Sequence, residues 1–81
     1  MSGARRLALP RGARVLAAPG GQPLEVDGQA VEHVRESWLV EDRWWTDEPL
    51  RRRYWELVGE RGRNVVIFHD LCTGQWFMQG S

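Results

Sequence analysis

The chain has 81 residues, and its 11 basic and 11 acidic side chains give a formal net charge of zero. A chain of this length forms one small domain, and the charge balance argues against a protein that holds nucleic acid by charge alone. Its single cysteine, Cys72, excludes an internal disulfide. Because no apolar run reaches the roughly 20 residues of a membrane span, we expect a soluble, cytoplasmic protein.

The N-terminus predicts a flexible arm ahead of the folded part. Residues 1–12 combine Gly, Ala, Arg and Pro without a sustained period, so we place the arm there and a single small β-domain over residues 13–81. The chain carries five Trp, one Tyr and two Phe. In so short a domain these aromatic side chains supply much of the surface that folding can bury.

A short hairpin is expected directly after the arm. Residues 14–18 are a strand candidate, and the Pro-Gly-Gly of residues 19–21 is a strong turn signal. In residues 24–27 apolar and acidic side chains alternate, which is the period of a strand. Asp27 and Gly28 then form a favoured two-residue hairpin turn.

The middle of the chain predicts a strand followed by an irregular loop. Residues 36–42 fit a strand better than a helix, because Trp38 and Val40 recur at every second position and hold no helical face. Pro49 interrupts regular structure, so residues 43–50 are expected to be a loop.

The last third predicts an antiparallel meander. Residues 53–58, 64–69 and 75–79 are rich in β-branched and aromatic side chains, and residues 59–62 and 70–74 have the composition of turns. Together with the N-terminal hairpin they give five to six short strands. We therefore expect an all-β fold, either a small, strongly curved antiparallel sheet or a partly open barrel, since closure hides the edges of the sheet.

Residues 38–79 also carry a distinctive aromatic pattern. It consists of Trp38, Trp44-Trp45, Asp47-Glu48-Pro49, Arg53-Tyr54-Trp55, His69-Asp70-Leu71 and Thr73-Gly74-Gln75-Trp76-Phe77. This pattern resembles a family of small bacterial proteins and the C-terminal tail of ImuB, the polymerase-like adaptor of the bacterial mutasome. The resemblance implies a non-catalytic, accessory role beside translesion polymerases. One departure is His69, which stands where the ImuB-like pattern usually has Arg.

Trp44 and Trp45 are the main candidates for partner binding. Adjacent residues of an extended chain face opposite ways, so at most one of the two can point into a core. One interpretation is that the other covers an open end of the barrel. The alternative is an aromatic platform for a partner's side chain or for a base, since Trp is enriched at interface hot spots and also stacks on bases.

Arg51, Arg52 and Arg53 follow this loop directly and complete the candidate site. As a solvated charge run they need no function, but beside exposed Trp an Arg can stack and bind phosphate. The acidic residues nearby favour a mixed-charge protein interface over a nucleic-acid surface. They are Glu41, Asp42, Asp47 and Glu48.

Asp70 and Gly74 are interpreted as structural residues of a turn, because Asp side chains accept backbone N–H bonds there and Gly adopts positive φ. His33, His69 and Cys72 match no familiar metal-ligand spacing. A solvent-facing His and a buried Cys72 thiol are the simpler expectation. We expect no metal, no cofactor and no catalytic residue.

These observations favour a non-catalytic protein-interaction module of bacterial DNA-damage tolerance, with translesion polymerase machinery as the partner that the resemblance implies. The alternative is a weak single-stranded DNA-binding module that uses the same Trp and Arg side chains. A homodimer joined through exposed aromatic residues is a third possibility. Trp38, Trp55 and Trp76 lie in predicted strands and are expected in the core.

Overall fold

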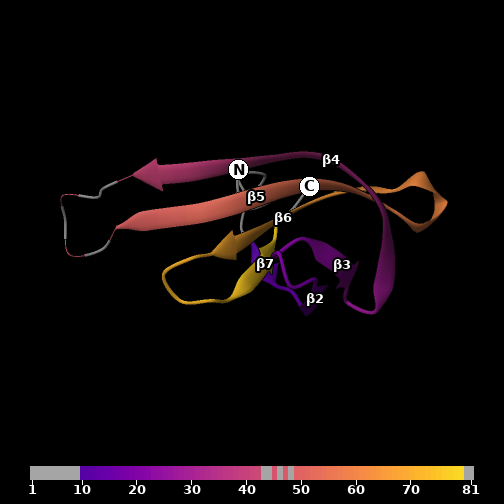
Figure 1. Cartoon of the computed structure of the whole chain (residues 1–81), viewed down its shortest axis with the longest axis horizontal. Coiled ribbons are helices and arrows are strands. Elements are labelled where there is room, and N and C mark those ends of the chain that lie inside the picture. Colours follow the sequence, from indigo (N-terminus) through magenta and orange to yellow (C-terminus); the bar gives the residue numbers. More distant parts are fainter. Residues whose placement is uncertain (1–9, 43–44, 46, 48, 80–81) are drawn as a thin grey trace, which may run out of the picture.

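The computed structural model describes residues 10–42, 45, 47 and 49–79 (Figure 1). Its strands are β1 (Arg11–Gly12), β2 (Val15–Ala17), β3 (Pro23–Val26), β4 (Gln29–Asp42), β5 (Leu50–Gly59), β6 (Asn64–Asp70) and β7 (Trp76–Met78), with one turn of 3-10 helix, η2 (Glu60–Gly62). Over this described part, no helix has the length and apolar character that crossing a membrane requires.

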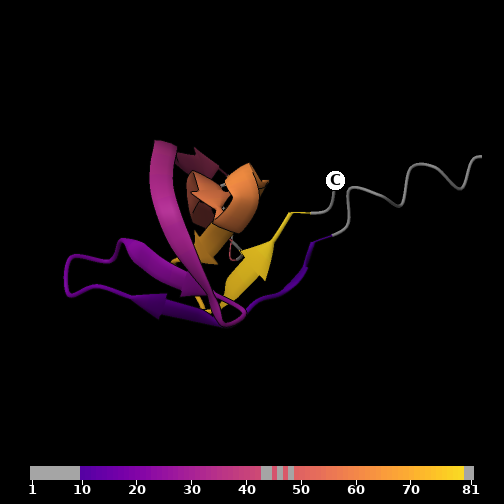
Figure 2. The ribbon, with the colours of Figure 1, turned by 90° about the vertical axis from the view of Figure 1, so that its right-hand side faces the viewer.

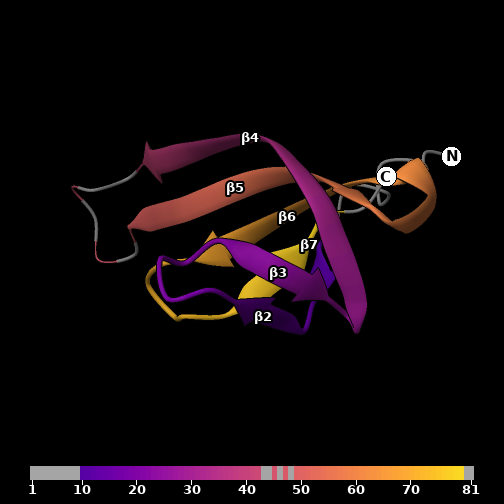
Figure 3. The ribbon, with the colours of Figure 1, turned by 45° about the vertical axis from the view of Figure 1, so that its right-hand side comes forward.

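The strands form one curled antiparallel sheet in the order β1-β7-β6-β5-β4-β3-β2. From β2 to β7 each strand pairs with the next one along the chain, so the meander predicted for the last third of the chain extends to its earlier strands as well (Figure 3). The all-β fold with a strongly curved sheet is thus confirmed. The described residues form seven strands rather than five or six, and β4 and β5 are long, with 14 and 10 residues.

The two ends of the sheet meet in one short segment of chain. β1 pairs with β7, whereas β2, two residues further on, pairs with β3. Between them the N–H of Ala13 donates to the carbonyl of Trp76 at 3.0 Å, and the N–H of Arg14 donates to Oδ1 of Asp27 at 2.9 Å. β1 and β2 are the two edge strands of the sheet, and the two residues between them hold these edges close together. The sheet therefore curls into a half-barrel (Figure 2).

The sheet begins within the predicted N-terminal arm. Strand β1 begins at Arg11, so the last two residues of the predicted arm belong to the sheet, and β1 pairs in register with Phe77 and Met78. Composition did not reveal this strand because two residues cannot show a period of two. The part of the predicted arm over residues 1–9 lies outside the described residues.

The turn between β3 and β4 has the backbone that its sequence favours. Asp27 has φ 51° and Gly28 has φ 84°, so both central residues are left-handed. Such turns match the right-handed twist of the flanking strands, and Asn, Asp and Gly tolerate them best. The predicted Asp27-Gly28 hairpin turn is confirmed.

The core lies on the inner face of the sheet, where side chains of β3, β5 and β6 meet. Val26, Leu57 and Ile67 are buried there, and Trp55 and Trp76 pack against them. The core role expected of these two tryptophans agrees with this packing. The same expectation for Trp38 is wrong. Trp38 is 37% exposed. The prediction failed because the alternation along a strand shows that the strand has two faces, but not which of them is covered.

Candidate interaction surfaces

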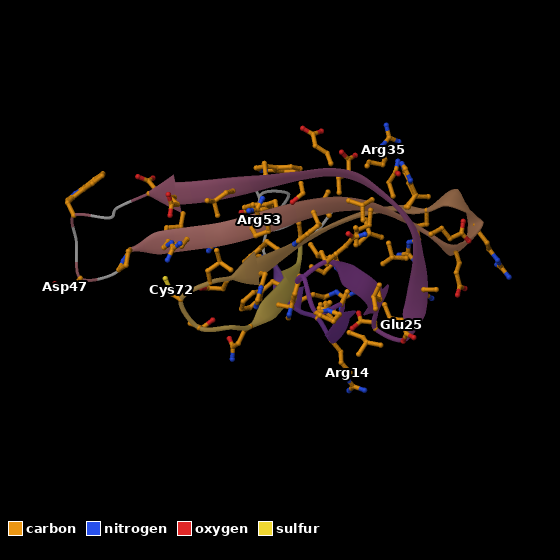
Figure 4. The ribbon with its side chains drawn as sticks, in the orientation of Figure 1. Arg14, Glu25, Arg35, Asp47, Arg53 and Cys72 are labelled. Atoms are coloured by element: carbon orange, nitrogen blue, oxygen red, sulfur yellow. The ribbon has the colours of Figure 1, made fainter. Side chains whose placement is uncertain are left out.

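The β4–β5 hairpin extends beyond the rest of the sheet. β6 pairs with β5 only as far as Arg52, whereas β4 and β5 continue to the pair Asp42 and Leu50. Asp47 therefore lies at the far end of a two-stranded arm (Figure 4). Trp45 sits in the same turn and is 64% exposed, the highest value among the exposed large apolar side chains of the described residues. Trp44, the other residue of the predicted pair, lies outside the described part of the chain.

The base of this arm is held by the turn between β6 and β7. The N–H of Leu71 donates to the carbonyl of Arg51 at 2.9 Å, and Sγ of Cys72 lies 3.6 Å from the carbonyl oxygen of Pro49. Cys72 is exposed, so the expected buried thiol is wrong: the residue belongs to a surface turn and not to a strand. Leu71 adds a second exposed apolar side chain, at 38%. We call Leu39, Trp45, Arg51 and Leu71 together the hairpin end.

An ion pair links the two strands of the arm. Glu41 and Arg51 are cross-strand neighbours, and Nε of Arg51 lies 2.9 Å from Oε2 of Glu41. Both side chains are about half exposed, so this pair contributes at most about 1 kcal/mol to stability. Its main consequence is local charge balance, since the carboxylate neutralises one cation of the hairpin end.

The three consecutive arginines do not form one patch. They lie on β5, where successive side chains point to opposite faces, so Arg51 and Arg53 share one face and Arg52 lies on the other. The guanidinium carbon of Arg52 lies 4.4 Å from the centroid of Phe68, and Nη1 of Arg52 donates to the hydroxyl of Tyr54 at 3.2 Å. Of the predicted binding set, Trp45 and Arg51 lie at the hairpin end, whereas Arg52 packs on the outer face of the sheet.

A row of four aromatic rings crosses that outer face. Trp38, Tyr54, Phe68 and Phe77 are paired in register from β4 to β7, with ring centroids 5.5, 5.1 and 5.1 Å apart. These spacings are within the range of stacked and tilted aromatic pairs. The individual strands were visible in the sequence. Their register was not, and it is the register that creates the row.

Carboxylates border this aromatic row on one side. Glu36 and Glu56 are cross-strand neighbours on β4 and β5, next to the stacked pair of Trp38 and Tyr54. Like charges placed directly opposite each other in a sheet are unfavourable. They also make this part of the outer face repulsive to phosphate.

The turn after β6 contains the two predicted structural residues. Oδ1 of Asp70 accepts the backbone N–H of Cys72 at 2.9 Å and that of Thr73 at 3.2 Å. Gly74 has φ 80°, and its N–H donates to the carbonyl of Asp70 at 2.7 Å. The side chain and the glycine thus satisfy the backbone of a tight turn.

His69 lies at the end of β6 and is partly buried, whereas His33 on β4 is exposed. The ring of His69 stacks on Trp76, with centroids 4.1 Å apart and planes 1° from parallel, and Nε2 lies 3.3 Å from the carbonyl of Gly74. In the described part of the chain, no three His, Cys, Asp or Glu side chains come together as a metal site would need.

Comparisons with known proteins add nothing to this geometry: no family model matches the chain, and no curated protein or solved structure shows significant similarity to it. The candidate surfaces are therefore defined by the chain's own residues.

Proposed function

We propose that this protein is a non-catalytic interaction module that binds a protein partner through its hairpin end. We further propose that the partner belongs to the translesion polymerase machinery of bacterial DNA-damage tolerance. The aromatic pattern of residues 38–79, which resembles the tail of the ImuB adaptor, supports this second part. The hairpin end supports the first.

The observation that carries the proposal is the exposure of Trp45 at the tip of a two-stranded arm. Tryptophan side chains dominate binding energies at protein interfaces because they bury a large area at a small cost in side-chain entropy. Leu39 and Leu71 are further exposed apolar side chains near the base of the arm, at 43% and 38% exposure. The ion pair of Glu41 and Arg51 gives this surface both charges, which suits a protein more than a polyanion.

Single-stranded DNA is the second candidate, and the aromatic row on the outer face favours it. Rings spaced across a sheet can stack on successive bases. Two features weaken this reading. Phe68 is almost fully buried beneath Arg52, and the carboxylates of Glu36 and Glu56 repel phosphate.

Affinity capture from a DNA-damaged bacterial lysate, with and without nuclease, tests the proposal. We expect nuclease-resistant capture of translesion proteins. Trp45→Ala should reduce it at least tenfold, because removing a central tryptophan costs more than about 2 kcal/mol at an interface hot spot. The matched control is Leu16→Ala, which removes a side chain that is also exposed, at 56%, but lies on β2.

Two outcomes would contradict the proposal. Equal loss of capture in both variants would show that the hairpin end is not special. Capture that disappears with nuclease, together with quenching of tryptophan fluorescence by an oligonucleotide, would support the single-stranded DNA candidate instead. The unfolding midpoint of each variant must match that of the parent, so that lost capture reports on binding and not on folding.

A further inference from the structure

A cavity opens at the end of the half-barrel opposite the hairpin end. Its walls come from the β3–β4 turn, the start of β4, the end of β5 and the segment that follows η2. In Figure 1 these segments lie at the far side of the molecule from the β4–β5 tip. The cavity is therefore separate from the surface proposed to bind a protein.

The interior of the cavity is apolar. Val26 and Leu57 line it and are buried, and Val31, Val65 and Met78 add partly buried apolar side chains. Its volume is about 170 Å³. For comparison, an apolar cavity of about 150 Å³ is large enough to bind benzene. The space therefore fits one compact apolar group, such as a phenyl ring or a branched aliphatic chain.

The mouth of the cavity carries a net positive charge. Two guanidinium groups, of Arg11 and Arg63, and one carboxylate, of Asp27, line it and are exposed. The carboxylate is already engaged, because Oδ2 lies 3.6 Å from Nη1 of Arg11 and Oδ1 accepts the N–H of Arg14 at 2.9 Å. Arg11 also donates to Sδ of Met78 at 3.1 Å. Neither of the ion pairs found among the described residues involves Arg63.

We propose that this cavity binds a small monoanion in which a carboxylate is attached to a compact apolar group. The apolar group fills the space above Leu57, and the carboxylate lies at the mouth beside Arg63. Arginine suits this task because its planar guanidinium can donate two parallel hydrogen bonds to a carboxylate. Two sources carry this chemistry: a free aromatic or branched acid, and the C-terminus of a peptide that ends in an apolar residue.

Methyl and amide chemical shifts of the full chain, measured by NMR during titration, test this site. The probes are benzoate for the free acid and N-acetyl-leucine for the peptide C-terminus. We expect one or both to give saturable shifts centred on Val26, Val31, Leu57 and Val65. The tighter probe identifies the source. Benzamide and N-acetyl-leucine amide are the matched neutral probes, and they should bind about fivefold more weakly.

Substitutions test separately how the positive charge and the apolar cavity contribute to binding. Arg63→Gln should weaken binding of the anionic probe about fivefold, because a partly exposed ion pair is worth up to about 1 kcal/mol. Arg61→Gln is the matched control, since Arg61 is an exposed arginine two positions away that does not line the cavity. Ala30→Phe places a large side chain at an exposed position of the mouth and should block both probes without unfolding the protein.

Three results would overturn the proposal. Shifts that fail to saturate, or that spread over the whole surface, would show non-specific association. Equal binding of the acid and its amide would show that the positive mouth plays no part. Equal weakening by Arg63→Gln and Arg61→Gln would assign the effect to general charge instead of to this site.

Discussion

Asp70 organises the turn between β6 and β7 through its side chain. One carboxylate oxygen accepts two backbone N–H groups, those of Cys72 and Thr73, which would otherwise depend on water. The same turn places Leu71 beside Arg51 at the base of the β4–β5 arm. Through this turn Asp70 supports the residues of the hairpin end.

Asp70→Ala should lower the free energy of unfolding by about 1 kcal/mol, because two exposed N–H groups lose their acceptor and gain only water in its place. Asp70→Asn should cost less, since the amide oxygen can accept the same bonds. Urea denaturation of the three proteins measures both effects. If the two substitutions cost the same, the negative charge opposite Arg52 matters more than the hydrogen bonds, and the interpretation of the turn is wrong.

Other single residues show which features the sequence could predict and which it could not. The sequence places Arg51, Arg52 and Arg53 together in one candidate binding set, whereas the alternation of a strand puts the side chains of neighbouring residues on opposite faces of the sheet. The difference comes from the loop boundary, because β5 begins at Leu50 and all three arginines therefore belong to a strand. The turn roles of Asp70 and Gly74 depend only on the preferences of neighbouring residues in the chain, so they can be predicted from the sequence.

At the scale of elements, the turns were easier to predict than the strands. Asp27-Gly28 has a strong local preference, and the β3–β4 connection follows it. β4 was expected to be half its observed length. Its pairing with β5 is irregular between Val31 and His33 and again between Val34 and Glu36. Each irregularity shifts the alternation by one residue, and so hides a single long strand from a search for a period of two.

The β3–β4 turn should be sensitive to a side chain at Gly28. Gly28→Ala is expected to cost about 1–2 kcal/mol, because Gly28 has φ 84° and an L-residue is strained in the left-handed region. Gly20→Ala is the control: a Cβ at either position meets nothing within 4 Å, but Gly20 does not have a positive φ. The change in urea midpoint compares them. A similar loss at both positions would argue that the left-handed backbone is not the cause.

At the scale of the whole molecule, the curvature of the sheet encloses the core, and the greater length of β4 and β5 produces the arm. The inner face wraps around Leu57 and Ile67, while the outer face carries the aromatic row. The arm projects at one end and the cavity opens at the other. An all-β, curled architecture follows from turn spacing and strand composition. The closure of the half-barrel does not, because it depends on pairing between residues that are more than sixty positions apart.

Ala13 lies at this closure and offers a direct test of its importance. Proline has no N–H, so Ala13→Pro removes the bond to the carbonyl of Trp76 and should detach β1 from β7. We expect a loss of about 1–3 kcal/mol of stability, because a partly buried carbonyl loses its donor.

Amide hydrogen exchange should accelerate first in β7, whereas the amides between β4 and β5 should change only as far as global stability falls. Ala13→Ser keeps the N–H and serves as the control. If Ala13→Pro leaves exchange in β7 unchanged relative to β4 and β5, the half-barrel does not need this closure, and its curvature must come from the β2–β3 hairpin and the core alone.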